Sequence, residues 1–322
     1  MNTIPDCKHI LFITSSRIGD AVLSTGILRH VAETDPQARV TVVCGKLAVS
    51  LFEGYPLLER VISLQKQKYN GHWFGLWRIV FSKRWDLVID LRNSVVSRLI
   101  FARQRRLFGG QIDKSRHKVE QASQLMGLSS VPSPMLWFSE QQKVRARAFI
   151  PPGAPVVLGV GPTANWAGKT WPAERFTEVV TWMTGPDGVM PGARVAVFAA
   201  PGEEADAQKV LRSLPQDRQI DLIAKADPGT AAAALSLCDF YLGNDSGLMH
   251  CAAAAGVRTL GLFGPSYPRL YRPWGDHCRF VSTPETFDEL IAFEGYDPKT
   301  TGTLMGSLSV DAVQSAILDM FK

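Results

Sequence analysis

The chain has 322 residues, 46% of them hydrophobic and 20% charged, and a formal net charge of +5 at pH 7. This length suits two domains, and the composition excludes disordered, collagen-like and low-complexity proteins. The five cysteines are an odd number without CxxC spacing, so neither a disulfide framework nor a zinc site is indicated. Neither a signal-peptide pattern nor a run of 18 apolar residues occurs, and we therefore expect a cytoplasmic protein.

The charge is unevenly divided along the chain. Residues 1–150 carry 22 Lys+Arg against 11 Asp+Glu, a net +11, while the remainder carries −6. A basic half suggests an anionic partner, such as a nucleic acid, a phosphorylated substrate or an acidic membrane surface. A solvated charged surface accounts for the charge alone equally well. No recognised RNA- or DNA-binding module accompanies it, so we do not expect nucleic-acid binding.

Short runs rich in apolar and β-branched residues alternate with stretches of helical length in the first half. The runs occupy residues 9–14, 39–43, 60–64 and 86–91. This alternation predicts βαβ units around a parallel sheet. The charged, proline-rich stretch 139–155 is interpreted as a linker, which gives a first domain of residues 1–150.

The same pattern restarts after the linker. Its apolar runs occupy residues 156–161, 194–200, 220–224, 239–243 and 258–264. We therefore expect a second doubly wound α/β domain over 151–308, facing the first across a cleft, with ligands at the carboxyl ends of the strands. Residues 309–322 predict an amphipathic helix, capped by Ser309, that packs back across the first domain.

The stretch GNDSGLMHCAAAAG, residues 243–256, places a strand end directly before a helix that begins near Ser246. Unpaired N–H groups and the helix dipole make such a start a natural site for phosphate oxygens. Gly247 leaves room for close approach, His250 lies one turn further on the same face, and Asp245 can accept hydrogen bonds from sugar hydroxyls. Alternatively, Asp245 or Ser246 is an ordinary cap and His250 a structural histidine.

Two further loops of the second half carry charged residues at strand ends. In GPTANWAGKTWPAERF, residues 161–176, Lys169 could neutralise a diphosphate, although a single loop lysine is more often solvated. In FAAPGEEADAQ, residues 198–208, Glu203 and Glu204 open a helix, where acids are favoured by the dipole. One of them could instead hydrogen-bond a ribose diol.

In the first half, ITSSRIGDAVLSTGILRHV, residues 13–31, predicts a strand, a loop and a helix. It contains neither GxGxxG nor GxxxxGK[ST], so the Rossmann fingerprint and the P-loop are both absent. Asp20 stands at the helix entrance. It is either an N-cap worth about 1 kcal/mol or a general base facing the cleft.

Taken together, SRIGDAVLSTGIL, KTWP, the PGEE turn, and NDSGLMHCAAAAG followed by GLFGPSYP resemble the glycosyltransferase family 9 heptosyltransferases of lipopolysaccharide inner-core assembly. The similarity runs from about residue 9 to 320. It implies the GT-B architecture, with the acceptor in the first Rossmann-like domain and the donor in the second. It also implies inverting transfer of heptose from ADP-L-glycero-β-D-manno-heptose to Kdo-lipid A or heptosyl-Kdo-lipid A. The implied protein is a monomer without metal or cofactor that contacts the cytoplasmic face of the inner membrane peripherally.

The resemblance also assigns roles to residues of this chain. Asp20 is the expected base, Lys169 is expected to hold the diphosphate, and Glu203 or Glu204 the ribose. The residues expected to contact the diphosphate and heptose are Asp245, Ser246, Gly247 and His250. The basic residues expected near acceptor phosphates or membrane are Arg17, Arg98, Arg103, Arg105, Arg106, Lys114, Arg116 and Lys118.

Two departures from the family pattern keep other activities open. The loop at residues 161–164 is Gly-Pro-Thr-Ala, and Thr170 stands where a basic residue is common in the family. A relative that uses another nucleotide sugar or acceptor is therefore one alternative. A nucleotide- or glycan-binding protein without turnover is the other, although such a protein has no need of an acid at Asp20.

Overall fold

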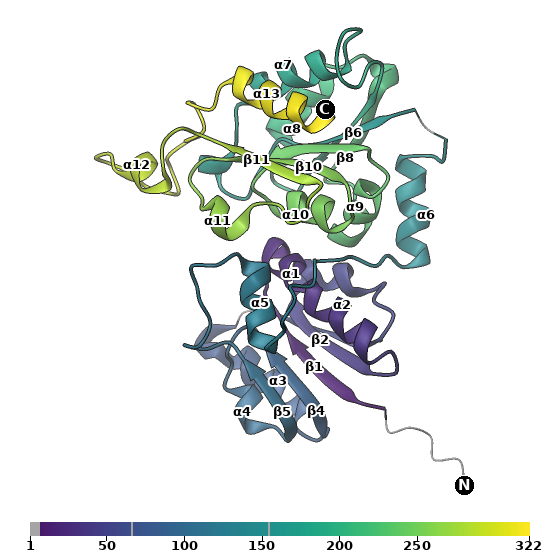
Figure 1. The fold of residues 1–322 in the computed structure, drawn as a ribbon, viewed down its shortest axis with the longest axis vertical. Coiled ribbons are helices and arrows are strands. Elements are labelled where there is room, and N and C mark those ends of the chain that lie inside the picture. Colours follow the sequence, from purple (N-terminus) through teal and green to yellow (C-terminus); the bar gives the residue numbers. More distant parts are fainter. Residues whose placement is uncertain (1–6, 66, 154) are drawn as a thin grey trace. The chain divides into compact units, whose positions relative to one another are not determined.

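The computed structural model describes residues 7–65, 67–153 and 155–322 (Figure 1). The chain divides into two compact units, Met1–Glu140 and Gln141–Lys322. The division falls at the start of helix α6 (Glu140–Phe149), inside the stretch that the sequence suggested as a linker. Nearly all of α6 therefore groups with the second unit, to which Arg145 adds a 3.7 Å ion pair with Asp227.

The N-terminal unit contains a parallel sheet of strand order β3-β2-β1-β4-β5. The strands are β1 (His9–Ile13), β2 (Arg39–Gly45), β3 (Leu58–Leu64), β4 (Trp85–Asp90) and β5 (Ala102–Leu107). The order reverses at β1, so the topological switch point, where such sheets bind ligands, lies between β1 and β4. The central strand β1 is buried along nearly its whole length, which explains why its sequence is a continuous apolar run.

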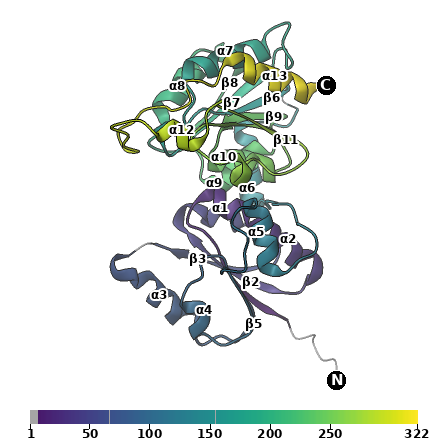
Figure 2. The ribbon, with the colours of Figure 1, turned by 60° about the vertical axis from the view of Figure 1, so that its left-hand side comes forward.

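Helices cover both faces of this sheet. They are α1 (Ile18–Leu23), α2 (Thr25–Thr34), α3 (Gly71–Val80), α4 (Val96–Leu99) and α5 (Lys118–Met126), with 3-10 turns η1 (Lys46–Phe52) and η2 (Lys68–Asn70). The helices α3 and α4 share one core cluster with β4, which contains Leu76, Val80, Trp85, Val96 and Ile100. Both therefore lie against the same part of the sheet (Figure 2).

The C-terminal unit contains a second parallel sheet of order β11-β10-β9-β6-β7-β8. The strands are β6 (Val157–Gly161), β7 (Arg194–Ala199), β8 (Gln219–Ile223), β9 (Phe240–Asn244), β10 (Arg258–Phe263) and β11 (Cys278–Ser282). Counted from β6, this is the doubly wound order 3-2-1-4-5-6, and its switch point lies between β6 and β9. The expected fold class, two Rossmann-like α/β domains, is confirmed.

The helices of this unit begin after the carboxyl ends of their strands. They are α7 (Ala173–Thr184), α8 (Glu204–Arg212), α9 (Pro228–Leu235), α10 (Gly247–Ala254), α11 (Pro268–Tyr271), α12 (Phe287–Ile291) and α13 (Val310–Phe321), with 3-10 turns η3 (Ala167–Lys169) and η4 (Gln216–Arg218). Among the residues described, no helix combines the length and apolar character needed to cross a membrane.

The C-terminal helix α13 packs on its own unit, contrary to the expectation that it crosses to the first domain. Its buried residues Val313 and Ile317 belong to the core of the C-terminal unit, where α13 contacts β11 and α7. The amphipathic pattern correctly indicated one buried face. It carried no information about which sheet that face covers. Ser309 is the N-cap, as expected, and accepts a 3.2 Å hydrogen bond from Ala312 N.

Candidate functional site

Polar residues converge at the switch point of the C-terminal sheet. Asn244 ends β9, Asp245 follows it, and Ser246 is the N-cap residue of α10. Trp171 N donates a 3.1 Å hydrogen bond to Asn244 Oδ1, which ties the loop after β6 to the end of β9. Asp245 N donates to Leu262 O at 2.9 Å. These bonds fix the connection between β9 and α10 from both sides.

Lys169, Asp245 and His250 lie together at this point, as the sequence predicts. Lys169 Nζ is 2.5 Å from Asp245 Oδ2, and His250 Nε2 is 3.9 Å from Asp245 Oδ1. The side chain of Lys169 is 24% exposed, and those of Asp245 and His250 are 7% and 4% exposed. The carboxylate thus holds the lysine at the start of α10. In the described part of the chain, no three His, Cys, Asp or Glu side chains are grouped so that they could hold a metal ion.

The N-terminus of α10 has no side-chain cap. Ser246 has the extended backbone of a cap residue, φ −144° and ψ 170°, yet within the described residues its hydroxyl makes no capping bond. Asp245 points to Lys169 instead. Neither Ser246 nor Asp245 therefore acts as an ordinary side-chain cap of α10. The first-turn N–H groups, beginning at Gly247, are available to an anion.

Tyr241 was not anticipated from the sequence. Its side chain crosses the ends of β6 and β9, where a Cβ at Gly161 or Gly243 would clash with its hydroxyl. Burial raises the pKa of Tyr241 far above its usual range. An interaction with the Ser246 side chain acts in the opposite direction and lowers this pKa in part. The sequence did contain an indication of this contact, because glycines at the ends of two strands mark a close approach by another group.

Unsatisfied buried polar atoms are concentrated at this end of the sheet. Six of them, in the part of the chain that the structure describes, have no hydrogen bond of normal geometry: Thr163 Oγ1, Trp166 Nε1, Tyr241 Oη, Asn244 Nδ2, Ser246 Oγ and Ser266 Oγ. All lie on or just after the adjacent strands β6, β9 and β10. Buried polar groups are nearly always paired, so this concentration indicates a place that a polar ligand or ordered water completes.

Glu203 and Glu204 lie in different environments. Gly202 N donates to both carboxylate oxygens of Glu204 at 3.0 Å. This bond, together with one from its own backbone N–H, lowers the pKa of Glu204. Glu203 is the N-cap residue of α8, is half-buried, and its charge acts on the buried Tyr241. Glu204 therefore stabilises its own turn, whereas Glu203 lies toward the site.

Asp20 lies in the N-terminal unit and is not a helix cap. The N-cap residue of α1 is Arg17, and Asp20 lies in the first helical turn without a capping bond. Ser15 Oγ donates to Asp20 Oδ2 at 3.4 Å, and Arg17 N donates to Ser15 Oγ at 3.1 Å. The carboxylate is therefore partly exposed, weakly held and located just beyond the carboxyl end of β1.

Asp90, at the end of β4 beside the switch point of the N-terminal sheet, was also missed. It is fully buried and accepts hydrogen bonds from Arg92 N (2.7 Å), Ser94 N (2.7 Å), Ser94 Oγ (2.6 Å) and Ser97 Oγ (2.5 Å). These bonds shape the loop from β4 to α4. Its sequence context, DLVIDL, indicates only a strand, because the donors follow in an unremarkable loop.

The basic residues expected near the acceptor are spread over α4, β5, the loop that leads to α5 and the first residue of α5, apart from Arg17 before α1. Some already hold local structure. Arg105 donates to the backbone carbonyls of Ser97, Ile100 and Ala102 at 2.7–3.1 Å. Further bonds are Arg98 to Asn93 at 2.6 Å, Arg103 to Asp86 at 3.4 Å, Arg116 to Asp113 at 3.3 Å and Lys118 to Gln121 at 3.2 Å. Arg105 thus stabilises the connection between α4 and β5.

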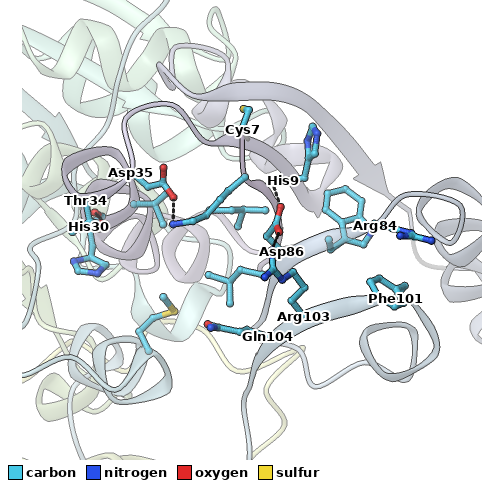
Figure 3. A pocket seen from close by; sticks show the side chains of 16 residues that line it. Cys7, His9, His30, Thr34, Asp35, Arg84, Asp86, Phe101, Arg103 and Gln104 are labelled. Carbon is cyan, nitrogen blue, oxygen red and sulfur yellow. Dashed lines mark hydrogen bonds and ion pairs between the residues drawn. The ribbon is translucent and has the colours of Figure 1, made fainter. Parts of the chain in front are cut away.

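A hollow of about 1030 Å³ lies at the opposite edge of the N-terminal sheet (Figure 3). It is lined by residues from the amino ends of β1, β4 and β5. Its charges are largely paired: Asp86 accepts from His9 N at 2.9 Å and from Arg103, and Lys8 lies 2.6 Å from Asp35. Ligands of doubly wound sheets bind at the carboxyl ends, so this hollow is not the candidate site.

Two Rossmann-like domains, each with a parallel sheet and a topological switch point, define a protein of the GT-B class. The family model "Glycosyltransferase family 9 (heptosyltransferase)" matches residues 110–290, more than half of the chain. The chain belongs to this family and is a glycosyltransferase, as the resemblance implied.

Individual relatives agree with this assignment. Lipopolysaccharide heptosyltransferase 2 of Salmonella typhimurium is 24% identical over 314 residues, which cover 84% of this chain and 87% of the relative. A glycosyltransferase family 9 structure from Veillonella parvula matches with a TM-score of 0.78 at 21% identity, covering 98% and 97% of the two chains. An E. coli heptosyltransferase bound to ADP matches with a TM-score of 0.71 at 18% identity, covering 97% and 99%.

Proposed function

We propose that this protein is an inverting heptosyltransferase that moves heptose from ADP-L-glycero-β-D-manno-heptose to the lipopolysaccharide inner core. The acceptor is Kdo-lipid A or heptosyl-Kdo-lipid A. The names of the relatives support the heptose and the lipopolysaccharide, and the ADP of the E. coli structure supports the nucleotide. The protein would act as a monomer at the cytoplasmic face of the inner membrane, where this acceptor is anchored.

The donor would bind at the switch point of the C-terminal sheet. The observation that carries this proposal is the uncapped α10 N-terminus beside Lys169, amid unsatisfied polar atoms. There the diphosphate can accept bonds from the first-turn N–H groups, which Gly247 leaves accessible, and from the Lys169 ammonium. Asp245 and His250, with the Ser246 hydroxyl, would hold the diphosphate and the heptose.

The ribose contact falls to Glu203 in this proposal. Glu204 already bonds its own turn through both oxygens, whereas Glu203 lies nearer to Tyr241 and the end of the sheet. A carboxylate can accept bonds from both hydroxyls of a ribose diol. Of the two acids that the sequence left open, we therefore propose Glu203 as the one that contacts the ribose.

In the proposed reaction, an acceptor hydroxyl oxygen bonds to the anomeric carbon from the face opposite the diphosphate. The bond between that carbon and the diphosphate oxygen breaks, and its electron pair leaves with ADP. Asp20 takes the hydroxyl proton as general base. Because negative charge grows on departing ADP, Lys169 and the helix N-terminus interact more strongly with the transition state than with the substrate. No step requires a cofactor.

The acceptor phosphates would be bound by the basic N-terminal unit. Arg17 precedes Asp20 at the start of α1, and its exposed side chain is well placed to orient a phosphorylated acceptor at the base. Arg106, Lys114 and Arg98 are exposed as well. Arg105 is the weakest candidate of this set, because its guanidinium is already bonded to three carbonyls.

The first experiment is calorimetric titration with ADP, UDP and GDP, together with an assay of ADP release from ADP-heptose and a Kdo-lipid A acceptor. Asp20→Asn should bind ADP normally and lose turnover by a factor of about 10² to 10⁴. Asp311→Asn is the matched control, since Asp311 is likewise an acid in the first turn of a helix, α13, and is exposed. Tighter binding of UDP or GDP than of ADP would contradict the proposal that the donor is an ADP-sugar. Equal turnover by both variants would contradict the proposed role of Asp20 as general base.

A further inference from the structure

Helix α3 exposes large apolar side chains on its outer face. Its inner face buries Leu76 and Val80, as expected for a surface helix. Its outer face nevertheless carries Phe74, 63% exposed, and Ile79, 46% exposed, and Phe81 follows the helix at 49% exposed. The Trp77 ring stacks on those of Phe74 and Phe81, with centroids 5.9 and 4.9 Å apart. A soluble helix normally presents polar side chains on that face.

The segment around α4 continues this apolar surface. Val95, Leu99 and Phe101 are 64%, 65% and 58% exposed. Helices α3 and α4 lie on the same side of the sheet (Figure 2), contact each other and share one core cluster, so their solvent-facing residues belong to one surface. The aromatic patch is defined here as Phe74, Ile79, Phe81, Val95, Leu99 and Phe101. Exposed apolar residues gathered in this way mark an interaction surface, unlike single ones scattered over a protein.

The charge around the aromatic patch is positive. Residues 60–112 contain 11 Lys+Arg and only two acids, Asp86 and Asp90. Asp90 is fully buried with four hydrogen bonds, and Asp86 is occupied by His9 N and Arg103. Arginine and aromatic groups are interleaved: the Arg84 guanidinium lies 5.4 Å from the centre of the Phe101 ring, and that of Arg92 lies 5.9 Å from the Trp73 ring.

We propose that the aromatic patch docks this enzyme on the surface of an anionic lipid bilayer. The apolar side chains would enter the boundary between headgroups and acyl chains, while the surrounding arginines meet lipid phosphates. A second copy of the chain is a poorer occupant, because a two-fold interface would set this positively charged surface against itself. The inference rests on the proposed function in one respect, that the acceptor named there is a lipid.

The test is flotation of the full-length protein with vesicles of phosphatidylglycerol and phosphatidylethanolamine, and with vesicles of phosphatidylcholine alone. Wild type should bind the anionic vesicles more tightly, and added salt should weaken binding. The double variant Phe74→Ser/Leu99→Ser should bind at least tenfold more weakly, since two large apolar side chains are lost. Arg78 is an exposed basic residue in the last turn of α3, and Arg78→Gln should bind anionic vesicles about five-fold more weakly.

Phe293→Ser is the matched control, because Phe293 is 47% exposed and also contacts a neighbouring ring, that of Tyr296, but belongs to the C-terminal unit. It should bind vesicles like wild type. Equal binding by Phe74→Ser/Leu99→Ser and wild type, or no binding by wild type, would overturn the proposal. So would light scattering that shows a wild-type dimer which the double variant abolishes.

A water-soluble, de-acylated acceptor separates this proposal from the proposed function. The double variant should turn it over at the wild-type rate, because the aromatic patch contains no residue assigned to the reaction. Wild type that binds vesicles but transfers no heptose would contradict the proposed function alone. Wild type that transfers heptose but ignores vesicles would contradict the docking surface alone.

Discussion

Replacing Lys169 should show how much its ion pair with Asp245 contributes to the free energy of unfolding. In Lys169→Met the carboxylate, 7% exposed, loses the ammonium 2.5 Å away and keeps the longer contact with His250, at 3.9 Å. Breaking a fully buried pair in this way costs about 3–5 kcal/mol. Because Lys169 keeps about a quarter of its side chain exposed, we expect a smaller loss, about 2 kcal/mol of unfolding free energy.

Equilibrium urea unfolding of the single variants Lys169→Met and Asp245→Asn and of the double variant measures this coupling. In the Asp245→Asn background the same lysine substitution should cost well under 1 kcal/mol, since no charge is left unpaired. Lys209→Met, which removes the 2.8 Å surface pair with Asp206, is the control and should leave the unfolding midpoint unchanged. An equal cost of Lys169→Met in both backgrounds would refute the reasoning.

Three further predictions concern the packing and the titrating groups around the two switch points. Gly161→Ala should lower the unfolding free energy by about 2 kcal/mol because its Cβ meets the Tyr241 hydroxyl, and Tyr241→Phe should relieve most of that loss in a double-mutant cycle. Asp90→Ala should lower it by about 3 kcal/mol, since four donors, three of them buried, lose their acceptor; a urea midpoint equal to that of wild type would contradict this. Burial raises the pKa of Cys44 and Cys251 from 9.0 to about 12, so above pH 9 the unfolded chain releases these protons first and stability should fall. Urea midpoints at pH 8 and pH 10 test this, and their equality would contradict it.

The sequence predicted the α/β class, most strand positions and the gathering of Lys169, Asp245 and His250. Parallel strands with continuous apolar runs are readily recognised, and their carboxyl ends must share one edge of a sheet. The spacing around Ser246 therefore pointed to a candidate site at this edge, and the roles given to its residues stay predictions. The family resemblance supplied the activity, which no spacing argument could have given.

What the sequence did not reveal depended on three-dimensional contacts, most of them between distant segments. Tyr241 lies within an ordinary apolar strand, and only the glycines of two adjacent strands show that its ring crosses them. The acids Glu203 and Glu204 are neighbours in sequence, yet only the backbone geometry of the turn separates their roles. The destination of α13 was likewise set by which sheet had an uncovered face, and an amphipathic pattern does not record that.

The alanine-rich helices beside the site have a consequence for its tolerance to mutation. Every residue of α9 after Pro228 is buried, α10 ends in three buried alanines, and the two helices contact each other. Their side chains act as spacers of minimal thickness that set how near the first turn of α10 comes to the strand ends. Whether a substitution in α9 or α10 is tolerated should depend on the volume of the new side chain and not on its polarity. Serine at Ala253 would be accepted more readily than valine, although valine is the more hydrophobic of the two.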